Sequence, residues 1–93
     1  MSEHQEHLFL QLIFMFQTAA MQHMGKLKNP LTDTIDRDLD QASVAIDILD
    51  MLKQKTKGNV TEEEARMLDT VLSTLKLNYV EERSKESKAD ESS

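Results

Sequence analysis

Hydrophobic residues recur at helical spacing in three stretches of the chain. The first stretch is residues 8–24, where 12 of 17 positions are apolar and no charged residue interrupts them. It predicts a helix over residues 6–24, which Gly25 closes by adopting a left-handed conformation. The Asn29-Pro30 pair prevents this helix from continuing, so the residues that follow it are predicted to form an ordered loop.

The other two stretches predict a pair of helices at residues 39–57 and 62–82. Apolar side chains alternate in steps of three and four along both, which is the spacing of one helix face. Asp38 and Thr61 are placed to cap the two starts, each with a Gln or Glu three residues later, as in a capping box. Because only a short connection around Gly58 joins them, the two helices are predicted to pack as an antiparallel hairpin.

Composition limits this architecture to one domain. The chain has 93 residues, 39% of them hydrophobic, with three Phe, one Tyr and no Trp, so aliphatic side chains must form most of the core. Residues 83–93 offer nothing to bury and are predicted to be a disordered, acidic C-terminal tail. The sequence therefore predicts an all-α fold, a single three-helix domain over residues 1–82 in which a long apolar first helix packs on the hairpin.

The predicted first helix is apolar over more of its circumference than the hairpin can cover. Its apolar positions span an arc of roughly 260°, whereas a helix packed on a hairpin needs little more than about 100°. The central seam, predicted to face the hairpin, contains Phe9, Ile13, Phe16 and Ala20. The apolar residues on either side of it are predicted to form an oligomer interface: Leu8, Leu12, Met15, Ala19, Leu10, Phe14 and Met21. The second helix carries a smaller stripe on another side, which a lone hairpin would leave in water: Val44, Ile48 and Met51.

Either protein or lipid could cover the apolar surface of the first helix that the hairpin leaves exposed. The apolar stretch is shorter than the roughly 20 residues that span a bilayer, and its polar side lacks the Lys and Arg of helices that lie on membranes. Another copy of the chain is the simplest protein partner, because two-fold pairing is the commonest arrangement. We therefore expect a homodimer or higher oligomer, which acts by presenting a surface and can be a small subunit of a larger assembly with an unidentified protein. The alternative is a helical module whose apolar groove binds a lipid tail or a membrane surface.

Charge and residue content weigh against several other classes of function. The net charge of −6 opposes binding to nucleic acid or anionic lipid, and the absence of Cys excludes disulfides and thiolate metal sites. His4 and His7 form only a terminal pair, which is fewer ligands than zinc sites use. No Ser-His-Asp or Cys-His arrangement is present, so the sequence predicts no catalytic residue, metal or cofactor. The chain also opens without the basic residues of an export signal, which favours a reducing, cytoplasmic location.

One run of residues imitates a phosphate-binding loop. Residues 55–59 read Lys-Thr-Lys-Gly-Asn, but the Gly follows the Lys and Thr, and no strand precedes them. A helix C-terminus would repel phosphate. The run is therefore predicted to cap the second helix.

The chain resembles a small bacterial family, number 1844 in the domain-of-unknown-function series. The likeness is carried by residues 38–64, which read Asp-Leu-Asp-Gln-Ala-Ser-Val-Ala-Ile-Asp-Ile-Leu-Asp-Met-Leu-Lys-Gln-Lys-Thr-Lys-Gly-Asn-Val-Thr-Glu-Glu-Glu. It also takes in the apolar first helix and the Asn29-Pro30 turn, and so covers residues 8–82. Val60 stands in place of a more usual Leu, and the loop after Pro30 lacks an expected Gly. The resemblance implies a bacterial, cytoplasmic protein with no assigned catalytic residues.

Overall fold

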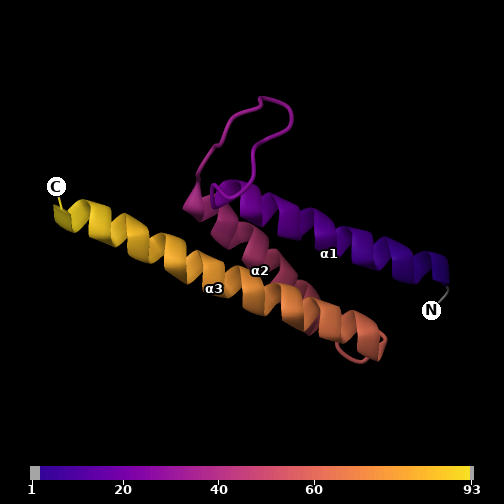
Figure 1. Cartoon of the computed structure of the whole chain (residues 1–93). Coiled ribbons are helices and arrows are strands. Elements are labelled where there is room, and N and C mark those ends of the chain that lie inside the picture. The colour runs from indigo at the N-terminus through magenta and orange to yellow at the C-terminus, as the bar shows by residue number, and fades with distance from the viewer. Residues whose placement is uncertain (1–2, 93) are drawn as a thin grey trace.

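The computed structural model describes residues 3–92, which form three helices: α1 (Glu3–His23), α2 (Leu39–Lys55) and α3 (Glu62–Ser92). Helices α1 and α3 run in the same direction and α2 runs opposite to both (Figure 1). Each helix packs against the other two, and the C-terminal part of α3 extends past the bundle (Figure 1). The predicted all-α, three-helix fold is therefore confirmed.

The starts of α2 and α3 have the predicted caps. The side chain of Asp38 accepts a hydrogen bond from the amide of Gln41 at 3.2 Å. At α3 the amide of Glu64 donates to the Thr61 hydroxyl at 3.1 Å, and the amide of Thr61 donates to Glu64 Oε1 at 2.8 Å. This reciprocal pair satisfies two amides that the first helical turn would otherwise leave unbonded.

Gly25 ends α1 as predicted. Its φ of 81° lies in the left-handed region, where a side chain would be strained. The amide of Gly25 donates to the carbonyl of Gln22 at 3.0 Å, and that of Lys26 donates to the carbonyl of Met21 at 2.9 Å. These two bonds form a Schellman motif, which satisfies the last carbonyls of the helix and turns the chain away from it.

The end of α2 differs slightly from the prediction. The helix ends at Lys55 and not at residue 57, because Thr56 closes the last turn. Both the amide and the hydroxyl of Thr56 donate to the carbonyl of Leu52, at 2.9 and 2.6 Å. Gly58, with a φ of 85°, lies in the connection that follows.

The largest difference is at the C-terminus, where residues 83–92 were predicted to be disordered but continue α3 as a helix. Charged side chains support this extension at helical spacing: Lys85 Nζ lies 2.8 Å from Glu82, and Arg83 lies 3.7 Å from Glu86. The segment is not acidic either, since residues 83–93 contain three Lys or Arg and three Asp or Glu. Ser93 lies outside the described residues.

The core lies where the three apolar seams meet. Its buried side chains are almost all aliphatic: Ile13, Ala20, Met24, Leu39, Ala42, Ala45, Ile46, Leu49, Leu68, Val71, Leu72 and Leu75. Phe9 and Phe16 pack against this cluster and are half-buried. The central seam of α1 therefore faces the α2–α3 hairpin, as its spacing predicted.

Replacing Leu72 by Asp should unfold the domain. Leu72 is only 3% exposed, so the substitution buries a carboxylate among aliphatic side chains with no cation to pair it. Far-ultraviolet circular dichroism should show the loss of helix. Leu77→Asp is the matched control, because Leu77 is on the same helix but 63% exposed, and this variant should keep its helicity. Equal stability of the two variants would contradict the core described above.

Candidate interaction surface

The residues predicted to form an oligomer interface lie on two flanks of α1, on either side of the buried Ile13 and Ala20. On one flank, Leu10 and Met21 are half-buried against the core, and only Phe14 is exposed, at 66%. The other flank contains Leu8, Leu12, Met15 and Ala19. Folding therefore covers most of the first flank, whereas the second is more exposed.

The second flank of α1 is largely uncovered. Met15 is 65% exposed and Leu8 is 48% exposed, whereas Leu12 and Ala19 are half-buried. The structure thus places all seven predicted residues at or near the surface, and three of them, Leu10, Phe14 and Met15, line one shallow hollow on α1 together with His7 and Gln11. Met15 and Phe14 are neighbours in the sequence, equally exposed, and lie on different flanks.

Helix α2 leaves its own apolar stripe exposed. Val44 and Met51 are 49% and 45% exposed, and Ile48 between them is half-buried. The sequence revealed this stripe, but the predicted interface did not include it. Helical spacing shows that the stripe exists, and only the packed structure shows where it lies relative to α1.

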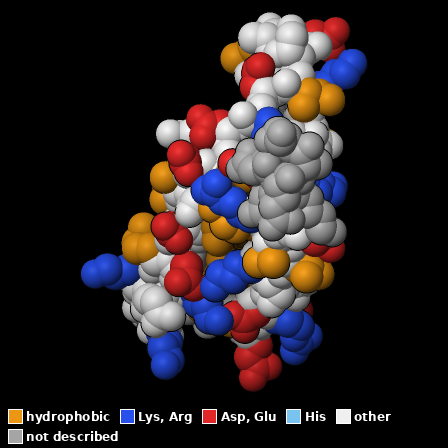
Figure 2. Space-filling view, turned by 90° about the vertical axis from the view of Figure 1, so that its left-hand side faces the viewer, with side chains coloured by type: hydrophobic (Ala, Val, Ile, Leu, Met, Phe, Trp, Pro, Cys, Tyr) orange, Lys and Arg blue, Asp and Glu red, His pale blue; other side chains and the backbone are white. Residues whose placement is uncertain are grey.

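The projecting loop, residues 24–38, is a surface that the sequence analysis did not identify (Figures 1 and 2). Asn29 donates to the carbonyl of Thr34 at 2.8 Å, and Asp33 adopts a φ of 56° in the tight turn between them. Leu31 is 93% exposed, and Figure 2 shows hydrophobic side chains among charged ones on the loop at the top of that view. Apolar residues without helical spacing are the only signal of this exposure in the sequence.

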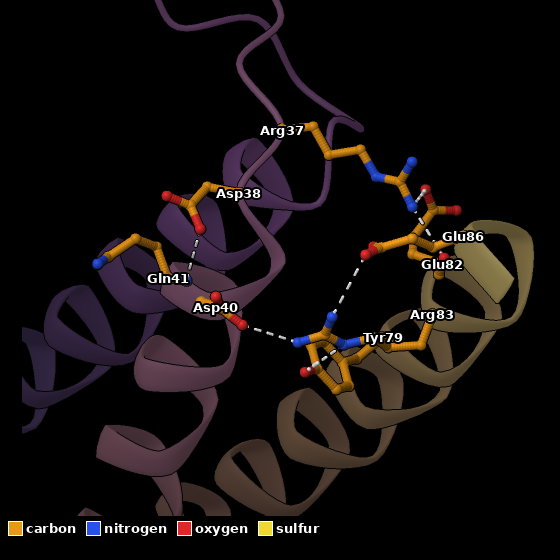
Figure 3. A network of polar contacts seen from close by, with 8 residues as sticks. All are labelled: Arg37, Asp38, Asp40, Gln41, Tyr79, Glu82, Arg83 and Glu86. Atoms are coloured by element: carbon orange, nitrogen blue, oxygen red, sulfur yellow. Dashed lines mark hydrogen bonds and ion pairs between the residues drawn. The ribbon is translucent and has the colours of Figure 1, made fainter. Parts of the chain in front are cut away.

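An ion-pair cluster fastens the loop to α3. Glu82 is only 7% exposed and accepts a hydrogen bond from Lys85 at 2.8 Å. Its carboxylate also lies 3.5 Å from Arg37, which donates to the backbone carbonyl of Glu82 at 2.8 Å (Figure 3). Lys26 lies 3.8 Å from the same carboxylate. The Lys85 hydrogen bond, with Lys26 and Arg37 nearby, holds the pKa of Glu82 below its usual value, although burial opposes this shift. The cluster positions the loop and the start of α2.

A second cluster joins α3 to the start of α2. Arg83 donates to the Tyr79 hydroxyl and to Asp40, at 2.8 and 2.9 Å, and its guanidinium lies 5.3 Å from the centre of the Tyr79 ring (Figure 3). The hydrogen bonds to Tyr79 and Asp40 raise the pKa of Arg83. These contacts hold the end of the bundle together.

The pocket at the α2–α3 connection is lined by part of the run, residues 55–59, that resembles a phosphate-binding loop. It has a volume of about 280 Å³ and is lined by Thr56, Lys57 and Gly58 among others. The Thr56 hydroxyl is engaged by the α2 backbone, and Lys53 pairs with Asp69 at 2.6 Å. The hydrogen bond with Asp69 raises the pKa of Lys53. Two of the best-placed donors are therefore already engaged, and the carboxyl end of α2 disfavours an anion there.

A smaller apolar pocket lies between α1 and α3. Its volume is about 150 Å³, and it is lined by Leu10, Ile13, Phe14, Gln17, Met67 and Val71. This is below the roughly 300 Å³ at which sites for small molecules begin. It can take at most a side chain.

The predicted histidine pair lies in the first turns of α1. His7 Nε2 is 3.0 Å from the side-chain amide nitrogen of Gln11. Among residues 3–86, whose side chains the structure describes, no group of three or more His, Asp or Glu is placed to hold a metal ion. In the described part of the chain, no helix has both the length and the hydropathy needed to cross a membrane.

Comparison with known proteins identifies a family without a described activity. A family model described as a domain of unknown function, DUF1844, matches residues 6–81. No curated protein and no solved structure matches the chain. The matched range covers α1 from residue 6, all of α2, and α3 as far as residue 81, so the family model corresponds to most of the three-helix body.

Removing the charge of Glu82 should destabilise the protein at neutral pH but not in acid. The pKa of Glu82 is lowered on folding, so its stabilising effect is present above about 4.5, its ordinary value, and is lost as the pH falls through the lower folded-state value. Because its cationic partners are partly exposed, we expect Glu82→Gln to cost about 1–2 kcal/mol at neutral pH. Urea unfolding of the wild type and of Glu82→Gln, from neutral pH down to acid pH, measures the difference in their free energies of unfolding. A cost that is independent of pH would show that packing, and not charge, makes Glu82 important.

Proposed function

The chain belongs to the DUF1844 family of unknown function, and we propose that it is a non-catalytic interaction protein that associates with copies of itself through α1. One observation carries this proposal. After α2 and α3 have packed on α1, its Leu8, Phe14 and Met15 side chains are still 48%, 66% and 65% exposed. Large apolar side chains grouped on one helix favour burial in an interface.

The ionisable groups support binding instead of catalysis. Among the residues that the structure describes, the side chains with displaced pKa values are Lys53, Glu82 and Arg83, and each lies in an ion pair between segments of the fold. Lys53 and Arg83 line pockets at the two ends of α2, but both are already paired there, with Asp69 and Asp40. Groups engaged in this way brace the helices.

The charge of the chain supports a protein partner. A net charge of −6 creates a field that repels nucleic acid and anionic lipid headgroups. A second copy is the partner that is always available at the same concentration, and two-fold pairing is the commonest solution. The absence of Cys suits a reducing cytoplasm, where this oligomer would act alone or as a small subunit of a larger assembly.

Leu12→Asp should weaken self-association without unfolding the protein. Leu12 is half-buried on α1, so a carboxylate there keeps contact with water but interrupts the apolar surface. We expect the dissociation constant to rise at least tenfold, which corresponds to about 1.4 kcal/mol. Size-exclusion chromatography with light scattering, without detergent, gives the mass, and circular dichroism checks the fold.

A wild-type protein that stays monomeric at high concentration would overturn the proposal. If that monomer also bound neutral phosphatidylcholine vesicles, the lipid-binding alternative would replace it. Retention of the oligomer by a folded Leu12→Asp variant would show that α1 is not the interface.

A further inference from the structure

The projecting loop between α1 and α2 is closed at its base by contacts of its own. The amide of Asp38 donates to the carbonyl of His23 at 2.7 Å, so the two ends of the loop lie side by side. A Cβ added at Gly25 would lie 3.6 Å from side-chain carbons of Arg37, so the Arg37 side chain passes close to the base. Surface loops whose ends meet in this way form compact units.

The outer part of the loop has its own hydrogen bonds. The amide of Asn29 donates to the carbonyl of Thr34, and the amide of Asp33 donates to the carbonyl of Asn29, both at 2.8 Å. The amide of Leu31 donates to the side chain of Asn29 at 2.9 Å, and the Thr34 hydroxyl donates to Asp36 at 3.1 Å. Because each of these bonds joins two loop residues, they hold the shape of the loop but do not fix it to the helices.

Apolar packing does not fix the loop to the helices either. Met24 and Leu39, at the two ends of the loop, belong to the described core, but none of the residues between them does. Leu27, Leu31 and Ile35 are 44%, 93% and 58% exposed. The position of the loop on α3 therefore depends on polar contacts.

These polar contacts converge on one carboxylate. Lys26 follows the end of α1 and Arg37 precedes the start of α2, so they lie on the two arms of the loop. Lys26 lies 3.8 Å from the Glu82 carboxylate, and Arg37 lies 3.5 Å from it and also bonds to the Glu82 backbone (Figure 3). Glu82 is only 7% exposed, so salt screens these pairs less than it screens pairs on an open surface. One side chain thus holds both arms.

We propose that Glu82 is a latch: while it is charged it holds both arms of the loop on α3, and when it is neutral the loop leaves α3 as a unit while the three helices stay packed. The backbone bond between His23 and Asp38 and the bonds within the loop do not involve Glu82, so the loop keeps its shape. The core contains none of residues 25–38, so it does not depend on where the loop lies. The latch is independent of the proposed self-association.

Acid is the condition that opens this latch. The groups paired with the Glu82 carboxylate are Lys26 and Arg37 from the loop and Lys85 from α3, and all three stay charged in acid. Further titratable groups lie at this end of the described bundle but are not ion-paired with Glu82: His23, Asp38, Asp40 and Glu86. Because folding lowers the pKa of Glu82, the latch is closed at neutral pH and opens only as the pH falls below about 4.5, its ordinary value.

Trypsin tests the latch at neutral pH, because the loop contains the exposed Lys28. Cleavage of a folded protein follows the population of the opened segment, so Glu82→Gln should be cut after Lys28 roughly tenfold faster than the wild type. The masses of the fragments identify the bond that is cut. Circular dichroism checks that the helices are intact.

Variants of the three cations test whether the loop is released through its arms. Replacing Lys26 and Arg37 together by Gln should speed cleavage after Lys28 as much as Glu82→Gln does. Lys85→Gln is the matched control, because Lys85 bonds to Glu82 at 2.8 Å but belongs to α3 and not to the loop. It should leave the rate within about twofold of the wild type, since an exposed pair within one helix contributes little.

Spin labels test the opening in acid. The chain has no Cys, so Leu31→Cys and Leu77→Cys give unique labelling sites on the exposed loop tip and on the exposed side of α3. Electron spin resonance should give a narrow distribution of distances between them at neutral pH and a broad one in acid. With Glu82→Gln added, the distribution should be broad at neutral pH and should not broaden further in acid.

Each result supports or overturns the latch. Cleavage of Glu82→Gln at the wild-type rate would overturn it, and so would an equal acceleration by Lys85→Gln. Faster cleavage within the helices as well, such as after Lys76 of α3, would show that the whole fold loosens and that no separate loop movement exists. A wild-type distance that stays narrow in acid would overturn acid as the condition that opens the latch.

Discussion

The burial of α1 is the constraint on which the rest of the structure depends. No Asp, Glu, Lys or Arg occurs between residues 7 and 25, so every side of this helix except a narrow strip of Gln and Thr favours contact with apolar atoms. Helices α2 and α3 each cover one side of the seam that contains Ile13 and Ala20. Two helices packed on a third cannot enclose it, and the uncovered part is the surface available for an interface.

Polar contacts between separate segments hold one end of the bundle together. The Asp38–His23 backbone bond holds the start of α2 beside the end of α1, and the Glu82 cluster holds the loop base against α3. Both act at the same end of the bundle. Together they hold the start of α2 in place beside α1 and α3.

The clusters of charged residues join separate segments of this fold. Glu82, Arg83 and Lys53 all have displaced pKa values, which in an enzyme would direct attention to a catalytic cleft. Here each joins segments that are distant in the sequence. Displaced pKa values alone therefore do not distinguish a brace from a catalytic group.

What the sequence by itself determined is local. The Asp38 cap, the Thr61–Glu64 capping box and the Gly25 terminus depend on residues within a few positions of one another, and so do the helical seams. The helical extension past Glu82 was missed, because a polar segment without an apolar stripe gives no periodic signal. Only the tertiary structure decided which flank of α1 lies against α3, where Phe14 lines a small pocket with Met67 and Val71. Periodicity shows how apolar residues are arranged around a helix, but the positions of the neighbouring helices around it are set by packing between distant parts of the chain.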